Sequence, residues 1–144
     1  MIPEFTSNGW LPPGIFVASW SEFAERFAVF NRSNQRMAVI RSMEALYLEA
    51  KKSGIVKRFL VAGSILSVKD EPNDFDCVLV LDEVILAQEL PPFQYNLVSR
   101  RMARRLFKGD VVPVLDGSVA MQNYLEFFQM NREGQRIGLV EIQL

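Results

Sequence analysis

Histidine is absent from this 144-residue chain, and cysteine occurs only once. The lack of histidine excludes Ser-His-Asp hydrolysis, Cys-His proteolysis and zinc sites built on histidine. One cysteine cannot form an intrachain disulfide, so the fold is not built on disulfides. Any catalytic metal would therefore be held mainly by oxygen atoms, which are the ligands preferred by Mg²⁺ or Mn²⁺.

Long hydrophobic runs are also lacking. The longest unbroken apolar run is 77–81, far below the ~20 residues that span a bilayer. Residues 1–5 carry no basic segment and no long apolar segment of the kind found in a secretory signal. We therefore predict a cytoplasmic protein without membrane contact. The net charge of −1 gives no overall attraction to nucleic acid, although a local basic patch is compatible with it.

The length and the composition fit one domain over residues 1–144. Apolar residues make up 49% of the chain and charged residues 23%, which is typical of a soluble globular protein. Residues 1–18 are rich in proline, glycine and aromatic residues, and we predict that they form an extended arm packed on the domain.

Helical and extended patterns alternate along the rest of the chain, which predicts an α/β or α+β fold. Ser19 and Glu22 have the spacing of a reciprocal capping box. The patterns predict helices over 19–27, 33–53, 92–108 and 118–128, and strands over 56–61, 74–81, 110–115 and 136–142. Pro113 indicates that its strand lies near a sheet edge. Five aromatic residues are expected in the core: Trp20, Phe23, Phe27, Phe127 and Phe128.

Two aspartates at the start of the most apolar strand carry the clearest chemical signal. Asp74 and Asp76 are two residues apart, so in a strand their side chains point to the same side. Adjacent carboxylates repel each other unless a cation lies between them, and a divalent metal suits both. Cys77 next to them is expected to be a buried apolar residue and not a nucleophile.

A Gly-Ser turn precedes the aspartates by about ten residues. Gly63 would let the backbone approach a phosphate closely, and Ser64 would offer a hydroxyl. The helical turn after them would direct N–H groups toward an anion. Lys69, in the loop before the aspartates, is a candidate phosphate contact or a surface residue. These residues together predict a nucleotide-binding site.

The Gly63-Ser64 turn followed by Asp74-x-Asp76 resembles the signature of the DNA polymerase β-like nucleotidyltransferase superfamily, including the minimal nucleotidyltransferases. The sequence is more closely similar to a group of small bacterial nucleotidyltransferase-like proteins of unknown function. Residues 8–14 and 124–129 also resemble that group, so the similarity covers nearly the whole chain. The resemblance implies a nucleotidyltransferase fold, with a small mixed sheet flanked by helices.

By this resemblance, Asp74 and Asp76 would bind Mg²⁺ ions that bridge to the triphosphate of a nucleotide. A hydroxyl or phosphate of a protein, RNA or small-molecule acceptor would then attack the α-phosphorus, and pyrophosphate would leave. Active members of the superfamily add a third carboxylate from a later strand. Asp110 is the better candidate for it, because Asp116 lies in a segment that is typical of a turn and a helix cap.

Five basic residues lie close together before Asp110: Arg100, Arg101, Arg104, Arg105 and Lys108. They would share one arc of the 92–108 helix, opposite Tyr95, Val98, Met102 and Leu106. One interpretation is that Arg101, Arg104 and Arg105 contact phosphates of a nucleotide or of an RNA acceptor. The other is a solvated helix face without a ligand.

Two classes of function follow from these features. The first is a Mg²⁺-dependent nucleotidyltransferase that uses a nucleoside triphosphate. The second is a catalytically inactive module of the same fold that binds a partner protein, for example in a toxin–antitoxin or defence system; a nucleotide sensor would lie between the two. The small size and the uncertain third acid favour the inactive module, whereas the aligned aspartates favour the enzyme.

Overall fold

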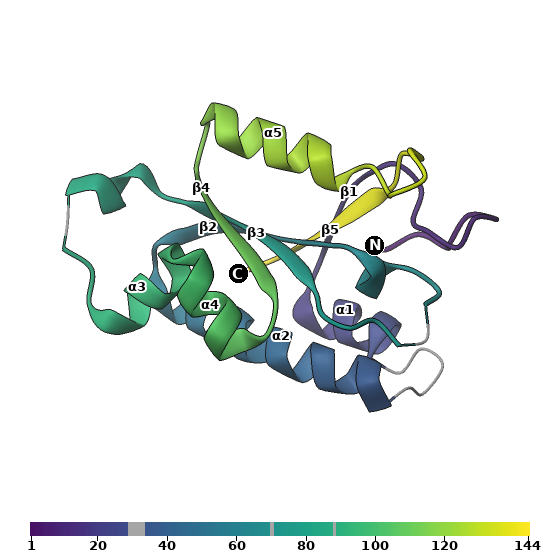
Figure 1. Ribbon diagram of the computed structural model, residues 1–144, viewed down its shortest axis with the longest axis horizontal. Coiled ribbons are helices and arrows are strands. Elements are labelled where there is room, and N and C mark those ends of the chain that lie inside the picture. The colour runs from purple at the N-terminus through teal and green to yellow at the C-terminus, as the bar shows by residue number, and fades with distance from the viewer. Residues whose placement is uncertain (29–33, 70, 88) are drawn as a thin grey trace.

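The structure is a computed structural model that describes residues 1–28, 34–69, 71–87 and 89–144. Its described part is a mixed α/β fold built on a five-stranded sheet (Figure 1). In chain order the helices and strands are β1 (Gly14–Ala18), α1 (Trp20–Phe27), α2 (Asn34–Ser53), β2 (Val56–Ala62), η2 (Ser64–Leu66), β3 (Asp76–Leu81), η3 (Glu83–Ala87), α3 (Pro92–Val98), α4 (Arg100–Phe107), β4 (Asp110–Leu115), α5 (Val119–Phe128) and β5 (Gly138–Ile142), where η2 and η3 are 3₁₀ helices.

The strand order in the sheet is β1-β5-β2-β3-β4. Strand β3 pairs in parallel with β4 and antiparallel with β2, whereas β5 pairs antiparallel with β2 and parallel with β1. Strands β1 and β4 therefore form the two edges. Pro113 lies in β4, as expected of a proline that cannot donate to a further strand.

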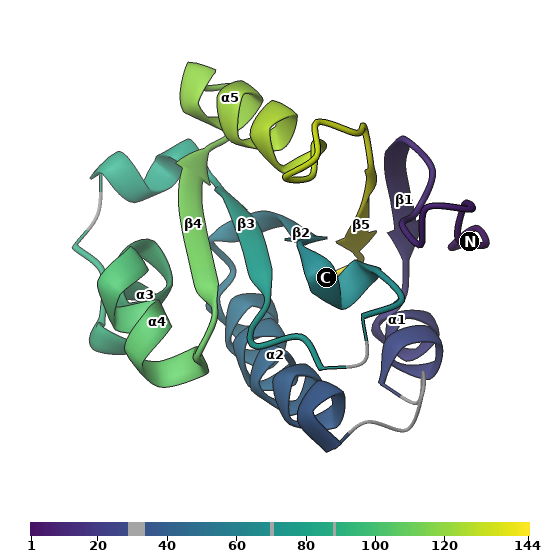
Figure 2. The same ribbon diagram turned by 45° about the vertical axis from the view of Figure 1, so that its right-hand side comes forward.

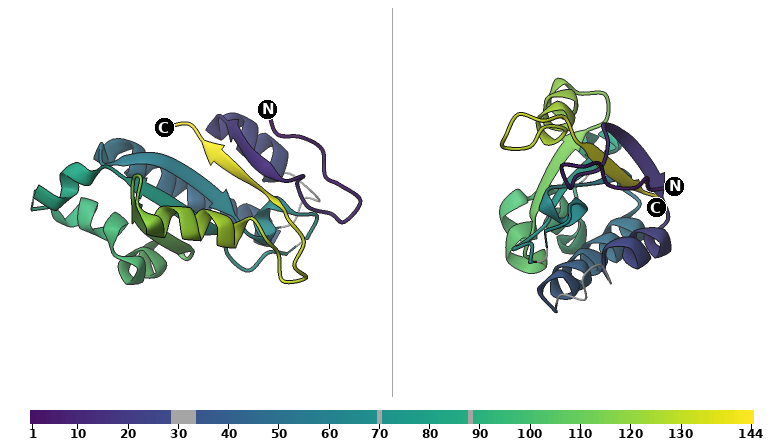
Figure 3. Two further views of the ribbon diagram at one scale, coloured as in Figure 1. Left: turned by 90° about the horizontal axis from the view of Figure 1, so that it is seen from above. Right: turned by 90° about the vertical axis from the view of Figure 1, so that its right-hand side faces the viewer.

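The helices form two unequal layers on the sheet. Helices α1 to α4 lie on one face and α5 lies alone on the other (Figures 2 and 3). The alternation along β3 matches these layers, because Cys77 and Leu79 join the core beneath α1 to α4, whereas Val78 and Val80 join the core beneath α5. All four side chains are fully buried, which confirms that β3 is covered on both faces.

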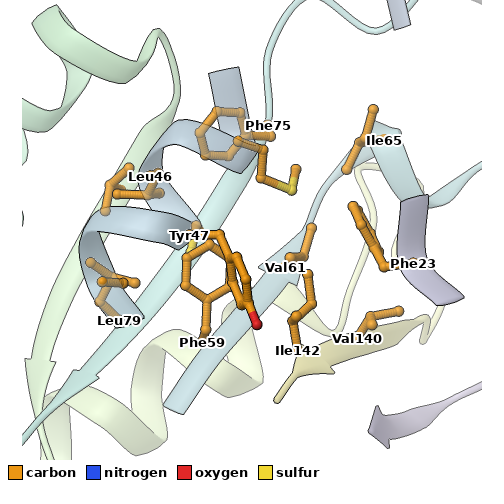
Figure 4. Packing of buried hydrophobic residues seen from close by; sticks show 14 of the residues in the cluster. Phe23, Leu46, Tyr47, Phe59, Val61, Ile65, Phe75, Leu79, Val140 and Ile142 are labelled. Atoms are coloured by element: carbon orange, nitrogen blue, oxygen red, sulfur yellow. The ribbon is translucent and has the colours of Figure 1, made fainter. Parts of the chain in front are cut away.

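The larger core lies between α2 and the sheet. Leu46 and Tyr47 of α2 project toward side chains of β2, β3 and β5 (Figure 4). The ring of Tyr47 packs edge-on against Phe59 and stacks on Trp20 of α1. The stripe predicted for α2 is buried as expected: Val39, Met43, Leu46 and Ala50. Helix α2 ends before Gly54, whose φ of 72° favours glycine.

Several boundaries differ from the sequence prediction. Residues 14–18 form the edge strand β1, so this part of the predicted arm belongs to the sheet. The predicted 92–108 helix is two helices, because Ser99 leaves the helical conformation and caps α4 by accepting from the Met102 N–H. Strand β3 begins at Asp76, two residues later than expected, and β5 begins at Gly138.

Smaller corrections concern side chains and one terminus. Ser19 caps α1 as predicted, but the Glu22 carboxylate accepts from the backbone N–H of Ile2 instead of that of Ser19. Phe127 is 69% exposed and does not belong to the core, whereas Phe23 and Phe27 are fully buried as predicted. The predicted start of α2 at Ser33 lies outside the described residues. Within the described ranges, no helix is long and apolar enough to cross a membrane.

Candidate functional site

Three aspartates meet where the parallel strands β3 and β4 begin. Asp76 and Asp110 are paired in register as the first residues of the two strands. Both share their side of the sheet with Val78 and Val112, which lie beneath α5. Asp74 precedes β3 by two residues. The parallel pairing of β3 with β4 therefore brings Asp74 close to Asp110, although the two residues are far apart in the sequence.

The buried ring of Phe75 fixes this arrangement from the opposite face. Its side chain is 1% exposed and belongs to the larger core. The Phe75 carbonyl accepts from the Asp110 N–H at 2.9 Å. Its ring fills the space where Gly109 would carry a Cβ, so only glycine fits there without a shift. Phe75 thus joins the segments that carry all three acids.

Two arginines of α4 neutralise two of the three acids. Arg100 donates to both oxygens of Asp110, with both distances at 2.8 Å, and Arg104 donates to Asp74 at 2.7 Å. Both pairs are partly exposed to solvent. The hydrogen bonds to Asp110 also raise the pKa of Arg100. The helix packs through Ala103 and Phe107, and Arg100 and Arg104 flank this buried face at helical spacing.

Asp76 lies deepest among the three. Burial, and to a smaller extent the negative charges of Asp74 and Asp110, raise its pKa from 3.8 to about 6. Arg104 and Arg100 only partly offset this effect. An acid held in this way carries excess negative charge near neutral pH, and a cation beside it would relieve the repulsion.

The Gly63-Ser64 turn lies against Asp76. Gly63 has a φ of 89°, and a Cβ added to it would lie 2.5 Å from the Asp76 carboxylate. Glycine is needed here for both reasons: the backbone conformation and the close approach of an acid. The helical turn expected after Gly63-Ser64 is present as the single 3₁₀ turn η2.

A buried arginine that the sequence analysis did not single out holds the loop after this turn. Arg36 of α2 has a fully buried side chain. Its guanidinium donates to the carbonyls of Ile65 at 2.6 Å, of Ser67 at 3.0 Å and of Lys69. Arg36 lies three and seven residues before Val39 and Met43, on the buried stripe of α2. A charged residue on an apolar stripe was the signal available in the sequence.

The acids and the turn line one pocket of about 1050 Å³. Its opposite wall comes from α5 and from the segments near Trp10 and Met130. The residues that line it include Gly63, Ser64, Lys69, Asp74, Asp76, Arg100, Asp110, Trp10, Tyr124, Phe127, Phe128 and Arg132. Tyr124 links the two walls, because its hydroxyl accepts from Arg100 at 3.4 Å.

The predicted basic residues separate into two groups. Arg104 contacts the acids together with Arg100, whereas Arg101 and Arg105 are exposed and are not among the residues that line the pocket. At about 100° per residue, Arg101 and Arg105 are rotated away from the sheet-facing side of α4. The apolar face expected for the helix is also displaced, because Tyr95 and Leu106 are about half exposed.

The remaining predicted residues are placed as follows. The side chain of Lys69 is exposed at the rim of the pocket. Asp116 lies at the opposite end of β4 from Asp110, roughly 20 Å away at the rise of a strand, and pairs with Lys57 at 3.0 Å. Cys77 is fully buried, and this burial raises the pKa of its thiol well above the usual value, which agrees with an inert residue.

Among the described residues, no group of three or more Asp, Glu, His or Cys side chains is arranged to hold a metal ion as it stands. The contacts of Arg100 and Arg104 give a physical reason, since they draw the carboxylates of Asp110 and Asp74 toward α4. The three acids are adjacent and offer only oxygen donors. A metal would therefore have to replace the arginines.

Comparison with known proteins gives one match. The model of DUF6932, described as a family of unknown function, matches residues 3–143. Comparisons with curated proteins and with solved structures find no significant match.

Proposed function

Since the chain belongs to the DUF6932 family, whose function is unknown, we propose a function from the site itself. The protein is a Mg²⁺-dependent nucleotidyltransferase that moves a nucleoside monophosphate from a nucleoside triphosphate to a protein, an RNA or a small molecule. We assign its fold to the nucleotidyltransferase type. The observation that carries the proposal is the parallel pairing of Asp76 with Asp110, beside Asp74 and the Gly63-Ser64 turn.

The residues fit Mg²⁺, or Mn²⁺, by the chemistry of their donors. Asp74, Asp76 and Asp110 would hold the ion through carboxylate oxygens, which hard divalent cations prefer. Burial first, and the charges of Asp74 and Asp110 second, raise the pKa of Asp76, and Arg104 and Arg100 offset this only in part, so a cation beside Asp76 would favour its charged form. When bound, the ion would neutralise the triphosphate and stabilise the oxygens that attack and leave the phosphorus.

The chain's own residues would bind and orient the nucleotide. The Ser64 hydroxyl and the Lys69 ammonium would contact phosphate oxygens from the loop held by Arg36. Arg100 and Arg104, once released from Asp110 and Asp74, would remain within reach of the same phosphates. In the reaction, a bond forms between an acceptor oxygen and the α-phosphorus, and the bond to pyrophosphate breaks. A hydroxyl acceptor loses its proton to one of the carboxylates or to water.

A second candidate is an inactive module of the same fold that binds a partner protein. The two arginine pairs favour it, because Asp110 and Asp74 already have cationic partners without a metal. In this case Arg100 and Arg104 would permanently take the place of a metal ion. The acids would then have a structural role, as the partners of these arginines.

Transfer of a labelled nucleotide separates the two candidates. We would incubate the protein and Mg²⁺ with each of the four nucleoside triphosphates, labelled at the α- or the γ-phosphate, and with RNA, protein and small-molecule fractions of a cell extract. The proposal predicts covalent incorporation of the α-label but not of the γ-label, and its loss in Asp76→Asn. Asp116→Asn is the matched control, because it removes an acid of the same strand region outside the pocket.

Incorporation that persists in Asp76→Asn, or of the γ-label instead of the α-label, would contradict nucleotidyl transfer at this site. No incorporation with any nucleotide or fraction would favour the inactive module.

A further inference from the structure

One wall of the pocket, formed by α5, is aromatic. Phe127 is 69% exposed, yet it lies on the C-terminal turn of α5 and lines the pocket together with Asp74, Asp76 and Asp110. A single exposed apolar residue on a surface is ordinary. Phe127 differs because its exposed ring borders the pocket that also holds the three acids.

Phe127 belongs to a small group of rings that present their faces or edges to one another. Phe128 packs edge-on against Phe127, with ring centroids 5.2 Å apart and an interplanar angle of 78°. Tyr124 stacks on Phe128, with centroids 6.3 Å apart. Phe128 and Tyr124 also pack on the core beneath α5. The exposed ring of Phe127 therefore packs on Phe128, which in turn stacks on Tyr124, and both of these rings are partly buried.

Side-chain contacts connect this aromatic group to the acids. The ring of Tyr124 lies under the guanidinium of Arg100 at 5.9 Å, and Arg100 holds Asp110. Trp10, which also lines the pocket, pairs with Ser67 in the loop after the Gly63-Ser64 turn. One ligand in the pocket can thus meet acids and the Gly-Ser turn at one end and aromatic rings at the other.

We propose that this wall, defined by Tyr124, Phe127 and Phe128, is a nucleobase-binding site in which the base of a nucleotide stacks on Phe127. The inference rests on the proposed function for its phosphate end and names the part of the pocket that takes the base. Every base has a π-face, and stacking on an aromatic side chain accepts different bases. The ring of Phe127 has no hydrogen-bonding group, so it contributes affinity without selecting the base.

The neighbouring surface offers a matched control. Val119, at the first turn of α5, is 72% exposed and does not line the pocket. If the exposed apolar residues of α5 formed a docking surface for a partner protein, Val119 and Phe127 would both contribute to it. If Phe127 serves a nucleobase, only Phe127 affects nucleotide binding.

Calorimetry with inorganic tripolyphosphate and with each of ATP, GTP, CTP and UTP, all with Mg²⁺, tests the inference. We expect the tightest nucleotide to bind wild type about tenfold or more tightly than tripolyphosphate, as expected for one stacked base. Phe127→Leu keeps an apolar side chain but removes the ring, and it should abolish this difference while tripolyphosphate binding stays unchanged. Val119→Ala should leave both affinities unchanged.

The possible failures are distinguishable. Equal affinities for nucleotide and tripolyphosphate in wild type, or nucleotide affinities that Phe127→Leu does not change, would overturn the base site and leave the phosphate site intact. No binding of either ligand would overturn both proposals. Nucleotide binding that depends on Phe127 but not on Asp76, tested with Asp76→Asn, would support the base site and contradict the metal-dependent function.

Discussion

The two faces of the sheet differ in how completely helices cover them. Helices α1 to α4 close one face over a large core that includes Phe75 and Cys77. On the other face α5 covers a smaller core, and the starts of β3 and β4 border the pocket instead. Strands β3 and β4 thus contribute buried apolar side chains to the face covered by α1 to α4 and charged side chains to the other face.

This difference shows how a short chain combines a packed core with an accessible group of acids. Residues that alternate along β3 take opposite environments, so the apolar side chains between the acids anchor the strand that carries them. The closed face fixes the backbone of Asp74, Asp76 and Asp110 through Phe75. The open face leaves their carboxylates accessible. Substitutions on the two faces should therefore change different properties.

The largest contrast is expected between two phenylalanines. Phe75→Ala on the closed face should lower the free energy of unfolding by about 3–5 kcal/mol, because it empties a fully packed site. Phe127→Ala on the open face should change it by less than about 0.5 kcal/mol, because the ring is mostly exposed. Urea denaturation of both variants measures the difference. Similar losses in the two variants would contradict the assignment of the faces.

Arg36 tests whether the closed face also holds the pocket loop. Arg36→Met keeps the apolar bulk but leaves the carbonyls of Ile65, Ser67 and Lys69 without this donor. Each buried carbonyl left unpaired costs about 1–3 kcal/mol, so we expect a loss of roughly 3 kcal/mol or more. Relative to wild type, the rate of backbone hydrogen exchange should increase most in residues 63–69. Wild-type stability in Arg36→Met would show that the loop is held by other contacts.

Asp76 should cost stability near neutral pH. Its pKa is about 6 in the folded protein against 3.8 for an unperturbed side chain, so the folded state binds the proton more tightly. Stability from this group is present below pH 3.8 and is lost as the pH rises through about 6. Asp76→Asn mimics the protonated acid and should melt a few degrees (roughly 3–6 °C) above wild type at pH 8.

The same comparison at pH 4.5 should give a much smaller difference, because Asp76 is then largely protonated in the folded protein. Melting curves of wild type and Asp76→Asn at both pH values test this without any ligand. A difference that does not depend on pH would contradict the raised pKa of Asp76.

The smallest effect on stability is expected for Arg104. Its pair with Asp74 is more than one-third exposed on both sides, and such pairs contribute about 0–1 kcal/mol. Arg104→Gln should therefore unfold nearly like wild type. If metal and arginine compete for Asp74, the variant should bind Mn²⁺ more tightly than wild type in the absence of nucleotide, which calorimetry measures. Weaker binding of Mn²⁺ alone would argue against that competition.

Local patterns predicted most of the elements, including the buried β3, the β4 edge and the caps at Ser19 and Ser118. The break at Ser99 escaped prediction because residues 92–108 keep helical periodicity on both sides of it. Strand β1 escaped because its partner β5 lies at the other end of the chain. Pairing between such distant segments leaves no local signal.

The site divides in the same way. Asp74 and Asp76 could be selected from their spacing, and Asp110 from its position at a strand start. The pairing of Arg100 and Arg104 with the acids depends on how α4 rotates against the sheet, which the position of Ser99 sets. Phe127 was wrongly predicted as a core residue, because an exposed phenylalanine and a buried one look alike in a sequence.

Binding of Mn²⁺, followed by electron paramagnetic resonance, tests the central claim most directly, that the three acids form a divalent metal site used with a nucleotide. Wild type and Asp116→Asn should bind Mn²⁺ more tightly when a nucleoside triphosphate is present. With the triphosphate present, Asp76→Asn should bind Mn²⁺ about tenfold or more weakly than wild type. Equal Mn²⁺ binding by wild type and Asp76→Asn, with and without each nucleotide, would contradict the account.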